Sequence, residues 1–266
     1  MDLGLAGKVI LVTGGASGIG EAIARTFAEE GSVVIVADRD VERGEAVVAD
    51  LVSSDRTALF IEAELTNETS VGGLIDKIRA SCGGLHGVVN NAAVNDGAGI
   101  ESGVDRFRRS VEINLVAQYS VVHHAVNLLR QSKGVIVNVG SKVADTGQGG
   151  TNGYAASKGG LNALTREWAV ELSRDGIRVN TVVPAEVWTP QYKSWLDHHA
   201  WNPEAARREI DELVPLGRRM TSTQEVADIV VFLASARASH VTGQIVYVDG
   251  GYTHLDRAMT VNRKFL

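Results

Sequence analysis

Residues 8–20, Lys-Val-Ile-Leu-Val-Thr-Gly-Gly-Ala-Ser-Gly-Ile-Gly, decide the fold. The apolar run 8–13 predicts a buried strand, and the helical spacing from Gly18 to Glu30 predicts a helix directly after it. Glycines between them permit a tight turn, close approach of the backbone to a phosphate, and close packing of helix on strand. The segment therefore predicts a pyrophosphate site at the positive end of a helix. A plain strand-to-helix turn is the alternative for such a motif taken alone.

The same alternation of strand and helix patterns continues along the chain. Further strands are predicted at 32–37, 57–62, 87–92, 134–141, 177–184 and 243–251, and further helices from Asp40, from Asn67, over 104–130 and over 152–174. Strands that are apolar on both faces and alternate with helices indicate a parallel sheet covered on both sides. We expect an α/β protein, a single-domain doubly wound Rossmann fold over residues 1–266, with about seven strands flanked by helices.

Two segments depart from this regular pattern. All four prolines lie between Pro184 and Pro215, so we expect residues 185–215 to form a mobile substrate loop over a pocket. The tail over 251–266 is too polar for a core strand, and we expect it to reach a neighbouring subunit's pocket; its polar residues are Tyr252, His254, Asp256 and Arg257.

The composition bounds the partners and the compartment. The chain has 266 residues, of which 44% are hydrophobic and 22% charged, and a formal net charge of −6, which is typical of a soluble globular protein. An acidic balance disfavours nucleic acid, because phosphate binding depends on clustered Lys and Arg. No apolar run approaches the ~20 residues that cross a bilayer. The single cysteine, Cys82, and a start without a basic leader favour the cytoplasm.

Asp38 bears on the choice of nucleotide. It ends the second predicted strand, 18 residues after Gly20, where a carboxylate can accept hydrogen bonds from both ribose hydroxyls of an adenosine. Its charge would repel a 2′-phosphate by roughly 4 kcal/mol at about 4 Å and a dielectric near 20, which favours NAD. Arg39 could bind such a phosphate instead, which leaves NADP open. A P-loop is excluded because Glu21 follows the glycines, whereas a methyltransferase that binds S-adenosylmethionine stays open from this half of the chain.

Tyr154 and Lys158 form the candidate acid/base pair. They are four residues apart near the start of the predicted helix 152–174, so their side chains share one face. An ammonium beside a phenol, together with an oxidised nicotinamide cation, favours the phenolate, and lowering the pKa by ~3 units takes roughly 4 kcal/mol. A Tyr-x-x-x-Lys pair alone also occurs on plain exposed helix faces. Its place after the glycine turn and the strand 134–141 favours catalysis.

Taken together, these motifs resemble the short-chain dehydrogenase/reductase family over essentially the full chain. The matches are Thr13-Gly14-x-x-x-Gly18-Ile19-Gly20, Asp38, Asn90-Asn91-Ala92, Asn114, Ser141 and Tyr154-x-x-x-Lys158. The resemblance implies that Ser141 hydrogen-bonds the substrate oxygen and that Tyr154 is the general acid/base. It also implies that Lys158 holds the nicotinamide ribose and that Asn114 anchors a proton-relaying water. Taken singly, Asn114 could instead pair backbone groups at a helix kink, and Ser141 could cap a turn.

The resemblance also implies a cofactor site, formed by Gly14, Ser17, Gly18, Ile19, Gly20, Asp38, Arg39, Glu64, Leu65, Asn91, Ala92, Tyr154, Lys158, Pro184, Val187 and Thr189. Two positions depart from the family pattern. Ala93 stands where Gly is common, and Pro184 is followed by Ala185 rather than Gly. The second departure leaves the loop conformation open and brings Glu186 close to the reacting centre.

The segments 142–152 and 186–203 are expected to select the substrate. They combine polar groups with aromatic faces, which suits a polyhydroxylated substrate such as a sugar. We expect the substrate to be bound by Ser141, Gln148, Tyr154, Glu186, Trp188 and Tyr192. The aromatic residues could instead close this part onto the body or onto a neighbouring subunit. The segments 184–192, 215–228 and 248–258 also resemble bacterial sugar dehydrogenases of the L-fucose dehydrogenase type, which implies oxidation of a free aldose at C1 to the lactone.

Two rival functions remain, a ketoacyl or secondary-alcohol reductase of the same family and a non-catalytic nucleotide sensor, which typically lacks the Tyr or the Lys. The pairs His123-His124 and His198-His199 do not suggest a metal, because helix neighbours point about 100° apart and no H-E-x-x-H spacing occurs. The resemblance further implies a homotetramer built on the long helices and the final strand.

Overall fold

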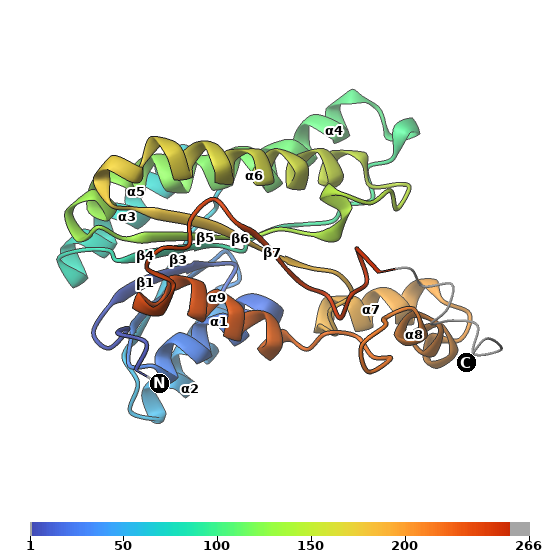
Figure 1. Ribbon diagram of the computed structural model, residues 1–266, viewed down its shortest axis with the longest axis horizontal. Helices are drawn as coiled ribbons and strands as arrows, with labels where there is room; N and C mark the ends of the chain where they lie inside the picture. Colours follow the sequence, from blue (N-terminus) through green and yellow to red (C-terminus); the bar gives the residue numbers. More distant parts are fainter. Residues whose placement is uncertain (1, 256–266) are drawn as a thin grey trace.

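Seven parallel strands form one sheet in the order β3-β2-β1-β4-β5-β6-β7 (Figure 1). The computed structural model describes residues 2–255, so Asp256 and Arg257 of the predicted tail lie outside the described residues. The strands are β1 (Val9–Thr13), β2 (Val33–Asp38), β3 (Ala58–Glu62), β4 (Gly87–Asn90), β5 (Val135–Val139), β6 (Arg178–Pro184) and β7 (Ile245–Val248). The predicted fold class, a doubly wound parallel sheet of about seven strands, is confirmed.

Helices cover both faces of the sheet (Figure 1). One face carries α1 (Gly18–Glu29), α2 (Val41–Ser53) and α9 (Thr223–Ala234), and the other carries α3 (Glu68–Cys82), α5 (Ala117–Ser132) and α6 (Asn152–Glu171). Successive β1 side chains enter opposite cores, Ile10 and Val12 on the α1 side, Val9 and Leu11 on the α3 side, as the two-residue period of a strand requires. Within the described residues, no helix has the length and apolarity to cross a membrane.

The predicted helix starts at Asp40 and Asn67 are confirmed. Both residues are N-caps whose side chains accept a backbone N–H, at 3.1 Å from Arg43 and 3.0 Å from Ser70. The predicted helix 104–130 is one continuous path in three parts. It comprises α4 (Val104–Val111), a π-helical turn η2 (Glu112–Val116) and α5. Such turns interrupt helices frequently at functional sites, and Asn114 lies within this one.

The stretch 185–215 is not the continuous loop that we expected, because it contains α7 (Pro190–His199) and α8 (Pro203–Glu212); its mobility stays a prediction. Pro190 and Pro203 each occupy the first turn of a helix, after the N-caps Thr189 and Asn202. A proline fits there, since the first helical N–H has no intrahelical partner. Figure 1 shows both helices beyond the end of β6. Short 3₁₀ turns complete the described elements, at η1 (Ile100–Ser102), η3 (Lys142–Ala144), η4 (Ser173–Asp175) and η5 (Ala236–Ala238).

Candidate active site

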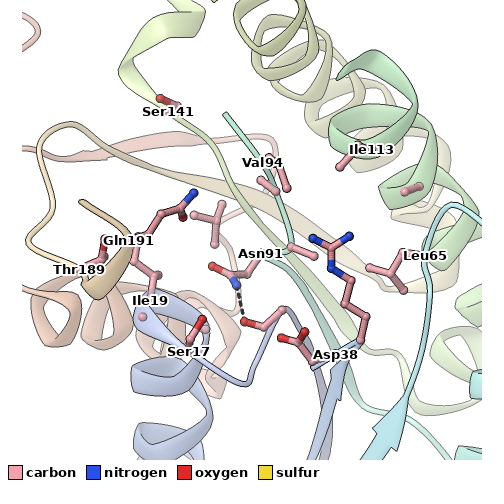
Figure 2. A pocket seen from close by; sticks show the side chains of 18 of the residues that line it. Ser17, Ile19, Asp38, Leu65, Asn91, Val94, Ile113, Ser141, Thr189 and Gln191 are labelled. Atoms are coloured by element: carbon pink, nitrogen blue, oxygen red, sulfur yellow. Dashed lines mark hydrogen bonds between the residues drawn. The ribbon is translucent and has the colours of Figure 1, made fainter. Parts of the chain in front are cut away.

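A cavity of about 670 Å³ opens at the carboxyl ends of the strands, beside β1 and β4, where the strand order reverses. Ligands bind at this switch point in open α/β sheets. In Figure 2, Ser141 and Asp38 lie far apart along the cavity, with Thr189 and Gln191 on one side and Leu65 and Ile113 on the other. Every residue predicted to bind the cofactor lines it, namely Gly14, Ser17, Gly18, Ile19, Gly20, Asp38, Arg39, Glu64, Leu65, Asn91, Ala92, Tyr154, Lys158, Pro184, Val187 and Thr189.

The glycine-rich turn is held tightly against the end of β4. The Asn91 side chain donates to the carbonyls of Thr13 (3.0 Å) and Gly14 (3.1 Å). A Cβ at Gly20 would lie 2.0 Å from the Gly14 carbonyl oxygen, so only glycine fits there. Gly18 has φ +58°, and the nearest atoms to a Cβ there belong to Thr189, 3.7 Å away. The turn is therefore a preformed cradle whose open side faces Thr189.

Asp38 joins the end of β2 to the same turn. Its carboxylate accepts hydrogen bonds from the backbone N–H groups of Ala16 and Asp40, both at 3.1 Å. Arg39 lines the cavity beside it and lies 4.0 Å from the carboxylate of Glu64, an exposed ion pair. The carboxylate is thus fixed at the cavity wall while the guanidinium is held toward Glu64.

Tyr154, Lys158 and Ser141 meet in the cavity. Lys158 is buried, donates a 2.8 Å hydrogen bond to the Val139 carbonyl, and its Nζ lies 5.5 Å from the centre of the Tyr154 ring. Burial lowers the pKa of Lys158 from 10.5 to about 7. Burial also raises the pKa of Tyr154, and a hydrogen bond with Ser141 acts in the opposite direction. The lowered pKa expected for Tyr154 depends on a bound nicotinamide cation as well as on Lys158. In the protein alone the pKa of Tyr154 is raised instead, because desolvation disfavours the phenolate.

Asn114 does not line the cavity. It is fully buried in the π-helical turn, where its side chain accepts from the Val94 N–H at 2.7 Å. The same amide donates to the carbonyls of Val94 and Ser110, each at 2.9 Å. Its side chain therefore fastens the loop after β4, and its role as a water anchor stays a prediction.

The residues predicted to bind substrate divide into two groups. Ser141, Tyr154 and Tyr192 line the cavity, whereas Gln148, Glu186 and Trp188 do not. Gln148 is exposed. The Trp188 ring is covered by the Arg207 guanidinium, 3.9 Å from its centre.

Glu186 forms an ion pair with Lys142 and accepts a 2.7 Å hydrogen bond from the Tyr192 hydroxyl. Glu186 does not line the cavity itself, but it is hydrogen-bonded to Tyr192, which does. The expectations that Glu186 lies close to the reacting centre and binds substrate stay predictions.

Several residues that line the cavity were not predicted, among them Arg43 and the series Arg109, Ile113 and Ala117. The last three are four residues apart, so the helical period identifies them as one face of the path from α4 to α5. That spacing was the signal that could have found them. Within residues 2–255, no group of three His, Cys, Asp or Glu side chains is placed to hold a metal ion.

A family model described as Enoyl-(Acyl carrier protein) reductase matches residues 14–253. Among curated relatives, L-fucose dehydrogenase of Oryctolagus cuniculus is 40% identical over 248 residues, which cover 92% of this chain and 85% of that protein. The 3-oxoacyl-[acyl-carrier-protein] reductase FabG of Thermotoga maritima is 34% identical over 249 residues, 93% of this chain and 98% of that protein. The relatives thus include proteins named for sugar and for acyl substrates.

Solved structures show the same similarity. The structure named Cj0485 dehydrogenase has a TM-score of 0.91 and 39% identity, covering 97% of this chain and 98% of that one. The aldohexose dehydrogenase of Thermoplasma acidophilum has a TM-score of 0.87 and 32% identity, covering 96% and 98%. The match therefore extends over nearly the whole chain.

Proposed function

Since the chain belongs to the short-chain dehydrogenase/reductase family, an oxidoreductase family that acts on CH–OH donors, we propose that it oxidises a free aldose such as L-fucose at C1 to the lactone. The observation that carries the proposal is the meeting of Ser141, Tyr154 and Lys158 in the cavity that the glycine turn lines. A short-chain reductase acting on a ketoacyl compound or another secondary alcohol is the alternative, which the similarity to the acyl-carrier-protein reductase supports.

The residues present fit a nicotinamide dinucleotide. Gly14 and Gly20 leave no room for a side chain, and Ser17 and Gly18 line the cavity at the start of α1, where backbone N–H groups bind phosphate. Asp38 would hold the adenosine ribose, and its charge favours NAD over NADP. At the other end, Lys158, Val187 and Thr189 would hold the nicotinamide half. When bound, the oxidised cofactor supplies the hydride acceptor and a positive charge next to Tyr154.

The chain's own residues supply the proton chemistry. We assign Ser141 to hydrogen-bond the substrate oxygen and Tyr154 to take the hydroxyl proton while the C1 hydrogen leaves as hydride, so that a C=O bond forms at C1. Lys158 shifts the balance toward phenolate in proportion to its charge. Burial lowers the pKa of Lys158 to about 7, so that its charge responds to pH changes near neutrality.

Two observations support a sugar as the substrate: the names of similar proteins and the polar lining of the cavity. Relatives and solved structures of similar fold are named L-fucose dehydrogenase and aldohexose dehydrogenase. The substrate end of the cavity is lined by the polar groups of Ser141, Tyr154, Gln191 and Tyr192. Hydroxyl-rich ligands suit such a lining better than an acyl chain does.

Substrate turnover tests the proposal directly. The purified protein with NAD and a panel of free aldoses, L-fucose included, is expected to form reduced nicotinamide, measured by its absorbance. A β-ketoacyl thioester with reduced nicotinamide serves as the competing assay. Activity on the thioester alone would establish the acyl alternative and overturn the sugar assignment.

We also propose that the protein is a cytoplasmic homotetramer. Long helices α5 and α6 lie on one face (Figure 1) and leave Tyr119 and Val170 exposed, at 50% and 75%. The proposal of a tetramer rests on the resemblance to the family, and these two helices are the surface on which copies of the chain would meet. Light scattering coupled to size-exclusion chromatography is expected to give four times the chain mass of 28.3 kDa; a monomer mass would overturn this.

A further inference from the structure

A chain of three polar side chains lies beside the substrate end of the cavity. Lys142, directly after Ser141, forms an ion pair with Glu186, and the two side chains are only 10% and 11% exposed. The Tyr192 hydroxyl donates to the second oxygen of Glu186 at 2.7 Å. Lys142 is also covered by the Tyr252 ring, whose centre lies 4.2 Å from Nζ. Three segments far apart in the sequence, around residues 142, 186–192 and 252, therefore meet at one buried ion pair.

Of these three side chains, only that of Tyr192 lines the cavity, whereas Lys142 and Glu186 do not. Tyr192 stands in the first turn of α7, where its backbone N–H bonds the capping hydroxyl of Thr189 at 3.1 Å. The side chain is thus fixed at its backbone and at its hydroxyl.

The direction of the hydrogen bond determines what Tyr192 can offer a ligand. A phenol has one proton, and an ionised carboxylate only accepts, so the Tyr192 proton is committed to Glu186. Toward any other partner, the Tyr192 oxygen can therefore act only as a hydrogen-bond acceptor. Burial and the neighbouring Glu186 charge raise the pKa of Tyr192, so the phenol stays protonated at working pH. The ammonium of Lys142 balances the Glu186 charge, without which a buried carboxylate would be costly.

We propose that Tyr192 is a specificity-determining residue that accepts a hydrogen bond from a second hydroxyl of the substrate, an inference that rests on the proposed function. Lys142 and Glu186 are then positioning residues, because they hold the proton of the Tyr192 hydroxyl toward Glu186. A hydroxyl can donate to Tyr192, whereas a carbonyl or carboxylate at that place would set lone pair against lone pair. The site would therefore select polyols over ketoacyl compounds.

Two simple alcohols test this independently of sugar identity. The wild-type protein is expected to show a kcat/KM for cyclohexane-1,2-diol about tenfold above that for cyclohexanol, the worth of one hydrogen bond. Tyr192→Phe is expected to bring the two values within about twofold of each other. An unchanged ratio in Tyr192→Phe would overturn the assignment.

Substitutions of the two positioning residues test whether the direction of the Tyr192 hydrogen bond, rather than side-chain packing, sets the preference for the diol. Glu186→Gln allows the Tyr192 hydroxyl proton to turn away from residue 186 and toward the cavity. Lys142→Met removes the positive charge that balances Glu186. Both variants are expected to lower the preference for the diol, chiefly by raising its KM. Lys142→Arg keeps the ion pair and is expected to restore the preference. Lys193→Met, which removes an exposed ion pair with Asp197 on the same helix, is the matched control and should leave it unchanged. Equal ratios in Lys142→Met and wild type would remove Lys142 from the proposal.

The outcomes also separate this inference from the proposed function. Turnover of the diol with none of the aldoses would overturn the aldose assignment and leave Tyr192 in place. Aldose turnover with a diol preference that survives Tyr192→Phe would overturn the role of Tyr192 alone. Turnover of neither class would overturn both.

Discussion

The Lys158 ammonium lies 5.5 Å from the centre of the Tyr154 ring. Its 2.8 Å hydrogen bond to the carbonyl of Val139 fixes it to the end of β5, the strand that leads into Ser141. One helix and one strand end thus set the relative positions of all three groups. Because both Tyr154 and Lys158 are desolvated, each shifts toward its neutral form.

Removing the phenol hydroxyl is expected to abolish catalysis. Tyr154→Phe loses the group proposed to accept the substrate proton, so kcat should fall by about 10² to 10⁴. NAD binding, measured by calorimetry, should change little, because most of the residues proposed to hold the dinucleotide lie elsewhere in the cavity. Tyr119→Phe, at a half-exposed position on α5, is the control. A fully active Tyr154→Phe protein would show that the catalytic assignment is wrong.

The buried Lys158 predicts a pH dependence of stability. Its pKa is about 7 in the folded protein and 10.5 in the reference state, so between these values the unfolded chain binds more protons. The free energy of unfolding should therefore rise with pH across this window, by at most about 1.4 kcal/mol per pH unit. Urea unfolding of wild type and Lys158→Met at pH 7 and pH 9 measures the difference. Parallel profiles would contradict a buried, neutralised Lys158.

Asp38 is expected to control the choice between NAD and NADP. In Asp38→Asn the oxygen that accepts from Ala16 is kept, while the charge that would repel a 2′-phosphate is lost. The ratio of kcat/KM for NADP to that for NAD should rise about tenfold or more. Asp40→Asn, which changes an acidic cap of α2 outside the cavity lining, should leave the ratio unaltered. A wild-type preference for NADP would refute the role given to Asp38.

Gly20 and Gly73 give opposite predictions for the same substitution. A Cβ at Gly20 would meet the Gly14 carbonyl oxygen at 2.0 Å and Asn91 Nδ2 at 2.5 Å, whereas nothing lies within 4 Å at Gly73 in α3. Gly20→Ala should lose cofactor affinity and stability together. Gly73→Ala should gain about 0.5–1 kcal/mol of stability, the helix propensity difference. Calorimetry and thermal unfolding would detect both, and a Gly20→Ala protein with native affinity would exclude the tight cradle.

Asn114 is expected to act on stability as well as on activity. Asn114→Ala leaves the Val94 backbone groups without the partners they have at 2.7 and 2.9 Å, which should cost about 1–3 kcal/mol of unfolding free energy. A residue that served only to anchor a water would lose activity with stability unchanged. Denaturant unfolding beside steady-state kinetics distinguishes the two.

Local sequence patterns accounted for most of the fold. The glycine turn, the apolar strands and the caps Asp40 and Asn67 act within a few residues of themselves, so their structures follow from short-range sterics and hydrogen bonds. The helices α7 and α8 were missed because Pro190 and Pro203 were read as loop markers, although each is the start of a helix.

Sequence patterns were enough to predict that the glycine turn and the Tyr154 and Lys158 pair meet at one edge of the sheet, because parallel strands bring their carboxyl ends together wherever they lie along the chain. Which substrate-side residues face the cavity depends instead on the packing of distant segments. Glu186 turns to Lys142, and Trp188 is covered by Arg207, because an ion pair or a stacked cation is formed by whichever partner the fold brings near. Desolvation of Tyr154 was likewise hidden from the sequence, since burial is a property of all the surrounding segments together.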